Sequence, residues 1–495
     1  MLKKLGEQPH MEGARTTFGE ARFPAPFAEG LEFSSPARGT WNIVHTGFLI
    51  PEAHEIFVCA RGCLRGVVLT AAEANALSRY SAIEIREENI LNGNMEELMV
   101  EGVADVLRKL PYRPRAVLLY ISCQHFFMAY DQGQVFAALR ERFPDIRFAD
   151  CYMIPTLRKS GLTPDQKMRI QLYSMLEPSD TAKNAPLPEV RDRQASEYKE
   201  SVLPVQADHH HVERDNSTCT AALSPDQTVP SPEKQHRTLN FIGSNLPVHP
   251  GAEWLPWLSA NGCTVTSLHD CRTFDDYLAM ANASANLYYE PLATMAAKSL
   301  EERLGQEAIY LPFVFSANGL RENYRMLSEK LHLPPLDVAP HEAVAEKALA
   351  HAREVIGNTP IAVDYTFTFR LLSFTRLLLE HDFHVTEIYA DSFLPEEAED
   401  FAWIREHFPD IAIWATNRPE MRFAQRLCDK KILAIGQKAA YFTGTEYFVN
   451  VAESGGYYGF EGICQIAKLM EEAFLQKKAP RDLIQRKGFG CESCI

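Results

Sequence analysis

The chain has 495 residues, of which 46% are hydrophobic and 23% charged, and its formal net charge is −15. This length exceeds what one hydrophobic core supports, so we expect several domains in a globular protein of ordinary composition. The negative charge argues against nucleic-acid binding, which needs a basic surface, and no apolar run reaches the length of a membrane span. No signal peptide is evident at the start, and the 11 cysteines are an odd number, so we expect a cytoplasmic protein with free or metal-binding thiols.

The first half of the chain predicts an arm, an α/β domain and a linker. Residues 1–40 are rich in Gly, Pro, Ala and charge and are expected to form an irregular arm. Residues 41–180 alternate apolar runs with amphipathic segments, which indicates parallel βαβ units. Their predicted strands are 42–45, 116–121 and 146–149, and their predicted helices are 94–110, with Asn94 as its cap, and 131–143.

Residues 181–237 are dense in Pro, Ser and charged residues and poor in large aliphatic residues. Such a segment cannot bury enough apolar area to offset its ordering entropy, so we expect a mobile linker or surface insertion. It contains His209, His210, His211 and Cys219, which we interpret as solvated linker residues.

Regular alternation resumes after the linker and predicts two further α/β domains, at 238–340 and 341–478. The first has predicted strands at 239–243, 264–268, 285–289 and 308–311, and the second at 361–364, 384–389, 411–414 and 432–435. The predicted fold is therefore α/β, with three Rossmann-like doubly wound parallel-sheet domains around a central cleft. A tail at 479–495 ends in Cys491-Glu492-Ser493-Cys494, which is compatible with a metal clip, a redox pair or a frayed end.

Cys63 and Cys123 each lie where a predicted strand gives way to a loop or helix. Ligands gather at the carboxyl ends of strands in open α/β sheets, so thiolates from two such ends can meet and hold iron. Cys59 is a third candidate, and Arg61 and Arg65 supply positive charge that favours thiolates. Soft thiolates without nearby histidine or carboxylate select an iron–sulfur cluster or zinc, whereas the alternative is three unrelated buried thiols.

One chain offers at most three of these cysteines, fewer than the four ligands of a self-contained site. The shortfall predicts a cluster shared at a subunit interface. Two thiolates from each of two chains would complete a four-iron four-sulfur site, and three from each would suit a larger cluster.

The segment from His45-Thr46-Gly47 to Cys63-Leu64-Arg65-Gly66, with Ile121-Ser122-Cys123 downstream, resembles the nitrogenase component 1 superfamily. The resemblance covers roughly residues 40–470 apart from the linker. In that family, cysteines matching Cys63 and Cys123 ligate the electron-entry cluster between two homologous subunits. The resemblance therefore implies an oxidoreductase with an iron–sulfur cluster, a separate ATP-dependent iron protein as electron donor, and a small-molecule substrate. It also implies pairing, as a homodimer or with a homologous component 1 subunit.

The family usually has an earlier cysteine, but residues 32–41 contain none, so Ser34 or Ser35 occupies that position or Cys59 replaces it. The stretch around Cys271 resembles the one that holds the iron–sulfur cofactor in catalytic subunits, which predicts a second cluster or cofactor in the interdomain cleft. The alternative is an incidental thiol in a helix-capping loop. No histidine precedes the glycine-aromatic stretch 455–462, so a molybdenum–iron cofactor held in the usual way, and dinitrogen reduction, are not implied.

Two other functions fit the sequence. The chain could be a scaffold or carrier on which a metallocluster or tetrapyrrole is assembled without multiple turnover. It could also be a small-molecule binding protein with degenerate cysteines. No phosphate-binding loop of the Gly-x-x-x-x-Gly-Lys-Ser/Thr type is present, so we expect no ATP hydrolysis by that route.

Overall fold

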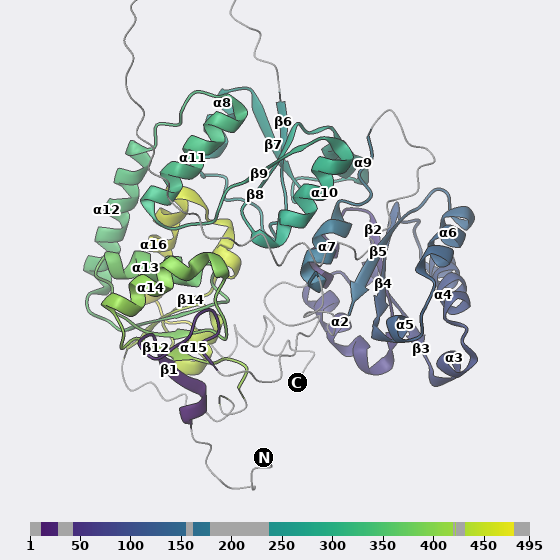
Figure 1. Ribbon diagram of the computed structural model, residues 1–495, viewed down its shortest axis with the longest axis horizontal. Helices are drawn as coiled ribbons and strands as arrows, with labels where there is room; N and C mark the ends of the chain where they lie inside the picture. The colour runs from purple at the N-terminus through teal and green to yellow at the C-terminus, as the bar shows by residue number, and fades with distance from the viewer. Residues whose placement is uncertain are drawn as a thin grey trace, which may run out of the picture.

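The computed structural model describes residues 11–27, 43–154, 162–178, 237–418, 421 and 431–479. In these residues the strands form three sheets with helices around them, and all strand pairs but one are parallel (Figure 1). The predicted α/β class with parallel sheets is confirmed. The domain boundaries stay a prediction, and residues 28–42, 179–236 and 480–495, with most of the predicted linker and tail, lie outside the described residues.

The first sheet has the strand order β3-β2-β4-β5. Its strands are β2 (Ala53–Ala60), β3 (Tyr80–Ile85), β4 (Ala116–Ser122) and β5 (Arg147–Met153). The accompanying helices are α1 (Ile43–Gly47), α2 (Arg61–Glu73), α3 (Glu87–Asn92), α4 (Met95–Lys109), α5 (Cys123–Phe127), α6 (Gln132–Arg142) and α7 (Pro164–Leu172).

The second sheet repeats this topology, with the order β7-β6-β8-β9. Its strands are β6 (Arg237–Phe241), β7 (Cys263–Ser267), β8 (Ala285–Tyr288) and β9 (Glu307–Tyr310). Its helices are α8 (Trp254–Ala260), α9 (Phe274–Ala279), α10 (Thr294–Leu304) and α11 (Ala317–Leu331).

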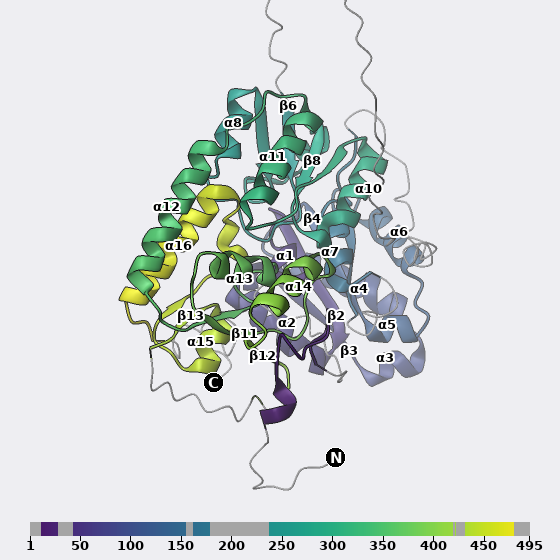
Figure 2. The same ribbon diagram turned by 60° about the vertical axis from the view of Figure 1, so that its left-hand side comes forward.

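The third sheet has the order β1-β12-β11-β10-β13-β14. Its strands are β1 (Arg15–Thr17), β10 (Ile361–Asp364), β11 (Val385–Tyr389), β12 (Ala412–Trp414), β13 (Leu433–Ile435) and β14 (Phe448–Val449). Its helices are α12 (Ala339–Ile356), α13 (Leu371–Glu380), α14 (Ala398–His407), α15 (Gln437–Thr443) and α16 (Gly459–Leu475), and α12 lies alongside α16 in both ribbon views (Figures 1 and 2).

Alternation along β4 explains why the first sheet is covered on both faces. Leu118 and Tyr120 pack into a core with α1, α2 and α7, whereas Val117 and Leu119 pack into another with α4 and α6. Successive side chains of a strand point to opposite faces, so a wholly apolar strand is a strand with helices on both sides. The core under α7 continues into α9 and α10 of the second sheet, so these two layers share apolar packing.

Helix starts follow from local capping where the side chains allow it. Asp131 accepts a hydrogen bond from the Gln134 N–H at 3.0 Å and starts α6 as predicted. Asn94 precedes α4 but its side chain makes no cap; its oxygen instead accepts from Asn89 Nδ2 at 3.3 Å. Asn94 is therefore the N-cap residue of α4 as predicted, although its side chain forms no capping hydrogen bond, and the helix itself is confirmed.

Two predictions about the first 47 residues are wrong. Residues 43–45, expected in a strand, begin the buried helix α1, because Tyr120 Oη donates to the Ile43 carbonyl at 3.0 Å and Gly47 packs directly on Glu55. The arm is not wholly irregular, since Arg15 to Thr17 form β1 antiparallel to β12. No helix among the described residues has the length and apolar character needed to cross a membrane.

Candidate metal centre

The first sheet changes direction between β2 and β4. The chain passes from β2 to β3 on one side and then returns to β4 on the other, so β2 and β4 are parallel neighbours. At such a switch point the two connecting segments leave on opposite faces and open a crevice at the carboxyl ends of the strands. Ligands bind in this position in open α/β sheets.

Cys63 and Cys123 both lie at this switch point. Cys63 is the third residue of α2, which follows β2, and Cys123 is the first residue of α5, which follows β4. The strands pair with Phe57 opposite Tyr120, which brings their carboxyl ends to the same edge. Cys63 is exposed and Cys123 half-buried.

The charges of these two thiols interact. Partial burial raises the pKa of Cys63, and the negative charge of Cys123 raises it further. Two thiolates that repel each other form a site that a metal cation would stabilise. The structure thus brings Cys63 and Cys123 together, and their role as metal ligands stays a prediction.

Cys59 lies in a different environment from the other two. It is the penultimate residue of β2 and is fully buried in the core on the same face as Phe57. Burial raises the pKa of Cys59 to about 12, and the charge of Cys63 adds to the effect. The Cys59 side chain is fully buried, whereas Cys63 is exposed and Cys123 half-buried, so the geometry favours Cys63 and Cys123 over Cys59 as ligands at this edge.

The turn that carries Cys123 is held from inside by His125, a residue that the sequence analysis missed. The Ser122 N–H donates to His125 Nδ1 at 3.1 Å, and the Ser122 hydroxyl donates to Gln124 Oε1 at 2.6 Å. Burial lowers the pKa of His125 to about 4, so its imidazole is neutral and accepts the hydrogen bond. The spacing Ser-x-x-His directly after an apolar strand is the signal that would have found this anchor.

The outer side of the same turn is apolar and exposed. Phe126 and Phe127 follow His125, and their ring centroids are 6.3 Å apart. On α2, Arg61 and Arg65 are exposed and form no ion pair within the part of the chain that the structure describes. The candidate centre therefore combines thiols, cations and aromatic rings on one accessible edge.

Within the described ranges no group of three or more Cys, His, Asp or Glu residues is arranged to hold a metal ion. One chain supplies two favourable thiols, half the ligand set of a four-iron four-sulfur cluster. The donor chemistry fits such a cluster if another chain supplies the other half. Cys491, Cys494, Ser34 and Ser35 lie outside the described residues.

Cys271, predicted to hold a second cofactor, follows β7 at the margin of the second sheet. It is buried, and its sulfur donates to the Ser267 carbonyl at 3.5 Å and contacts Met280 Sδ at 3.9 Å. Burial raises the pKa of Cys271 to about 11, and Asp276 adds to the effect. These contacts are those of a protonated core thiol and do not favour metal binding.

Aromatic rings fill space between the carboxyl ends of the second and third sheets, where the cleft was predicted. Tyr289 stacks on Tyr458 at 5.7 Å, and Phe313 contacts both Tyr458 and Phe369 at 5.4 Å. All of these rings except Phe369 are fully buried. These ring contacts pack the second sheet against the third.

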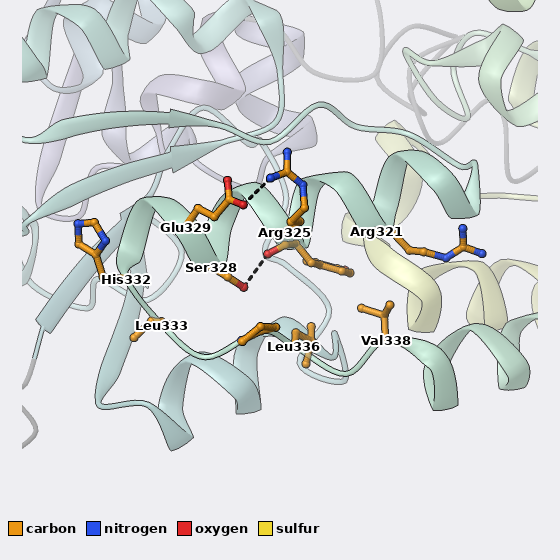
Figure 3. A pocket seen from close by; sticks show the side chains of 10 residues that line it. Arg321, Arg325, Ser328, Glu329, His332, Leu333, Leu336 and Val338 are labelled. Carbon is orange, nitrogen blue, oxygen red and sulfur yellow. Dashed lines mark hydrogen bonds and ion pairs between the residues drawn. The ribbon is translucent and has the colours of Figure 1, made fainter. Parts of the chain in front are cut away.

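A groove of about 420 Å³ lies elsewhere, between α11 and the segment that follows it (Figure 3). Its two arginines are already paired, Arg321 with Glu342 at 2.9 Å and Arg325 with Glu322 and Glu329. The lining contains no cysteine, so the groove is separate from the candidate metal centre.

Comparisons with known proteins agree with this architecture. The family described as "Nitrogenase component 1 type Oxidoreductase" matches residues 193–475, which is more than half of the chain. The solved structure "Nitrogenase Cp1 at pH 6.5" is similar with a TM-score of 0.58 and 10% identity, over 90% of this chain and 94% of that one. "Nitrogenase Cp1 at pH 5" is similar with a TM-score of 0.55 and 12% identity, over 94% of each chain. No curated protein matches the sequence.

Proposed function

Because this chain belongs to the nitrogenase component 1 type oxidoreductase family, we propose that it is an iron–sulfur reductase of the nitrogenase-like kind. In this proposal an ATP-dependent iron protein delivers low-potential electrons, and the chain passes them to a small molecule. The family match begins after the first sheet, so the cysteines there are argued from their own geometry.

The observation that carries the proposal is the position of Cys63 and Cys123 at the switch point of the first sheet, directly after two neighbouring parallel strands. Four thiolates complete a four-iron four-sulfur cluster, so two chains with two ligands each would be sufficient. A bound cluster of this type would take up and release single electrons at low potential.

The residues around the pair have separate tasks in this proposal. The hydrogen bond from Ser122 to His125 fixes the backbone that carries Cys123. Arg61 and Arg65 are exposed on α2 near Cys63 and would offset part of the negative charge of a bound cluster. Cys59 is fully buried in the core and serves packing.

We propose a substrate other than dinitrogen. The residues from Tyr447 to Glu453, which precede the glycine-aromatic stretch, include no histidine. Cys271, the other residue expected to hold a catalytic cofactor, is a buried and hydrogen-bonded thiol. The same observation favours the second candidate function, a scaffold or carrier that holds one cluster and does not turn over a substrate.

The proposed setting is the cytoplasm, with the iron protein and a second component 1 chain as partners. The test of the cluster is anaerobic purification with iron and sulfide analysis and electron paramagnetic resonance of the reduced protein. Cys63→Ser and Cys123→Ser should each lose most of the iron, whereas Cys464→Ser, which removes a comparable half-buried thiol on α16, should keep it.

Unchanged iron in both Cys63→Ser and Cys123→Ser would contradict the assignment. Turnover separates the two candidate functions. A reductase should consume a small molecule repeatedly when an iron protein and ATP are supplied, whereas a carrier should accept electrons once and stop.

A further inference from the structure

We propose that Arg370 and Tyr310, which lie where the second and third sheets meet, bind the carboxylate group of a small organic acid. We call this pair of residues the Arg370 site. The inference rests on the proposed function, because it gives the chemical class of the small molecule that the chain acts on. Binding of the acid needs no cluster, so the two proposals can be tested separately.

Arg370 is a buried cation whose side chain has no partner among the residues that the structure describes. It directly precedes α13 and is 5% exposed, and its Nε is buried without a hydrogen-bond partner. A buried charge is costly unless it is paired and hydrogen-bonded. An unpaired buried guanidinium therefore indicates a site for an anion.

The carboxylates close to Arg370 already have other partners. Glu397 accepts a hydrogen bond from the backbone N–H of Leu372 at 2.8 Å, and Asp400 pairs with Arg376 at 3.2 Å. The charge of Arg370 opposes the rise that burial causes in the pKa of Glu397 and of Asp400, but within the described part of the chain it forms an ion pair with neither. Arg370 also lies at the amino end of α13, where the helix dipole disfavours a cation and an added anion would offset that cost.

Tyr310 supplies a second donor without a partner. It is the last residue of β9, and its hydroxyl is buried with no hydrogen bond to any described residue. The segment after it packs on the segment before α13, because the rings of Phe313 and Phe369 lie 5.4 Å apart. The pKa of Tyr310 is lowered by the charge of Arg370 and raised by that of the exposed Glu396, while burial raises it most. Two unpaired donors, one from each sheet, favour a ligand with acceptor oxygens.

Aromatic rings beside the two donors favour an organic acid over an inorganic anion. Tyr310 stacks on Tyr288 with ring centroids 5.1 Å apart, and Tyr310 and Phe369 are both only partly buried. The fork of an arginine matches the two oxygens of a carboxylate, and partly exposed rings can pack against an apolar or flat carbon skeleton. The Arg370 site therefore combines a polar end and an apolar wall, as small-molecule sites commonly do.

The experiment measures binding by isothermal titration calorimetry with benzoate as the probe. Benzamide is its neutral match, and inorganic phosphate is the anion without a carbon skeleton. Arg370→Met should weaken benzoate binding at least about tenfold, the loss expected for a hydrogen bond to a charged group, and Tyr310→Phe should weaken it about threefold. Arg376→Met, which removes a paired cation from the same helix, should bind benzoate as wild type does.

Urea unfolding without ligand separates a binding residue from a structural one. Arg370→Met removes an unpaired buried charge, so its unfolding midpoint should rise above that of wild type. Benzoate should then raise the midpoint of wild type and leave that of Arg370→Met unchanged. A midpoint that falls in Arg370→Met without ligand would show that Arg370 is a structural residue and would overturn the inference.

The remaining outcomes distinguish this inference from the proposed function. Cys63→Ser should bind benzoate as wild type does, so loss of the cluster leaves the Arg370 site standing. A wild type that holds iron but binds no benzoate at millimolar concentrations, or binds it no better than Arg370→Met, overturns the site and leaves the cluster standing. Equal affinity for benzamide would contradict the need for a charge, and tighter binding of phosphate would contradict the choice of a carboxylate. Circular dichroism checks that each variant is folded.

Discussion

Breaking the buried ion pair between Arg169 and Glu290, which joins the first two sheets, should strongly destabilise the protein. Arg169 on α7 donates from Nη2 to Glu290 Oε2 at 2.8 Å and from Nε to the Gly243 carbonyl at 3.0 Å. The side chains are only 4% and 9% exposed. Arg169→Met leaves a carboxylate and a carbonyl oxygen buried without their donor, and breaking a buried pair in this way costs about 3–5 kcal/mol.

A matched control exists because another ion pair joins the same two layers at the surface. Arg115, which precedes β4, pairs with Asp275 on α9 at 2.8 Å, and both side chains are exposed. An exposed pair contributes about 0–1 kcal/mol, so Arg115→Met should change stability by less than about 1 kcal/mol. Urea unfolding followed by circular dichroism measures both variants.

The pH dependence of the stability lost in Arg169→Met gives a second check. Burial raises the pKa of Glu290, and the guanidinium of Arg169 opposes that rise. Without Arg169 the folded pKa of Glu290 lies further above its unfolded value, so the lost stability should return as the pH falls from 8 to 5. Arg169→Met with Glu290→Gln should recover much of the loss. A deficit equal to that of Arg115→Met, or one that does not change with pH, would refute this reasoning.

Three further outcomes are expected from unfolding measurements. Burial raises the pKa of Glu397 from 4.5 to about 7, so the free energy of unfolding of the wild type should fall by about 3 kcal/mol as the pH rises through this window. Glu397→Gln should remove that pH dependence, and equal slopes of unfolding free energy against pH for the two proteins would contradict the prediction. Gly436→Ala should lower the free energy of unfolding by at least about 2 kcal/mol, because φ is +111° and a Cβ would lie 2.3 Å from the Asp364 carboxylate. Gly305→Ala, where φ is +68° and no atom lies near the added Cβ, should lower it by about 1 kcal/mol. Tyr458→Ala should lower the free energy of unfolding by about 3–5 kcal/mol because ring packing is lost, whereas Tyr458→Phe should lower it by about 1 kcal/mol. Similar losses in both variants would argue against the packing explanation.

Much of the α/β pattern could be predicted because its signals are local. The strand Ile361–Asp364 coincides with its prediction, and the apolar stripe of the helix at 95–109 was visible in the sequence. The short run at 43–45 failed because a few consecutive apolar residues fit a buried helix as well as a strand. Long-range contacts, such as that of Tyr120 with the Ile43 carbonyl 77 residues away, accompany the helical form and are not visible in the local sequence.

The helix α7 was missed although its signal is local. Thr163 forms a capping box with Gln166, and Pro164 occupies the first helical position. The partner of its buried Arg169 could not be identified from the sequence, because Glu290 is 121 residues away. Long-range partners depend on how the domains pack, which no local pattern encodes.

The candidate site was partly within reach of sequence reasoning. Cys63 and Cys123 could be paired in advance because both follow strands, and the carboxyl ends of neighbouring parallel strands share an edge. To separate Cys59 from this pair, the direction of its side chain along the strand must also be considered. Cys59 lies two residues after Phe57 along β2 and therefore points into the same core, whereas Cys63 has left the strand for the first turn of a helix.

Strand β1 has a consequence for handling the protein. Its three residues occupy the outer side of β12, with Arg15 opposite Trp414 and Thr17 opposite Ala412. Without them, the backbone N–H and C=O groups of β12 would face solvent in a row and could recruit strands from other molecules. A version of the protein that lacks residues 15–17 would thus keep its thiols intact and yet tend to aggregate, so an affinity tag should be added without removing these residues.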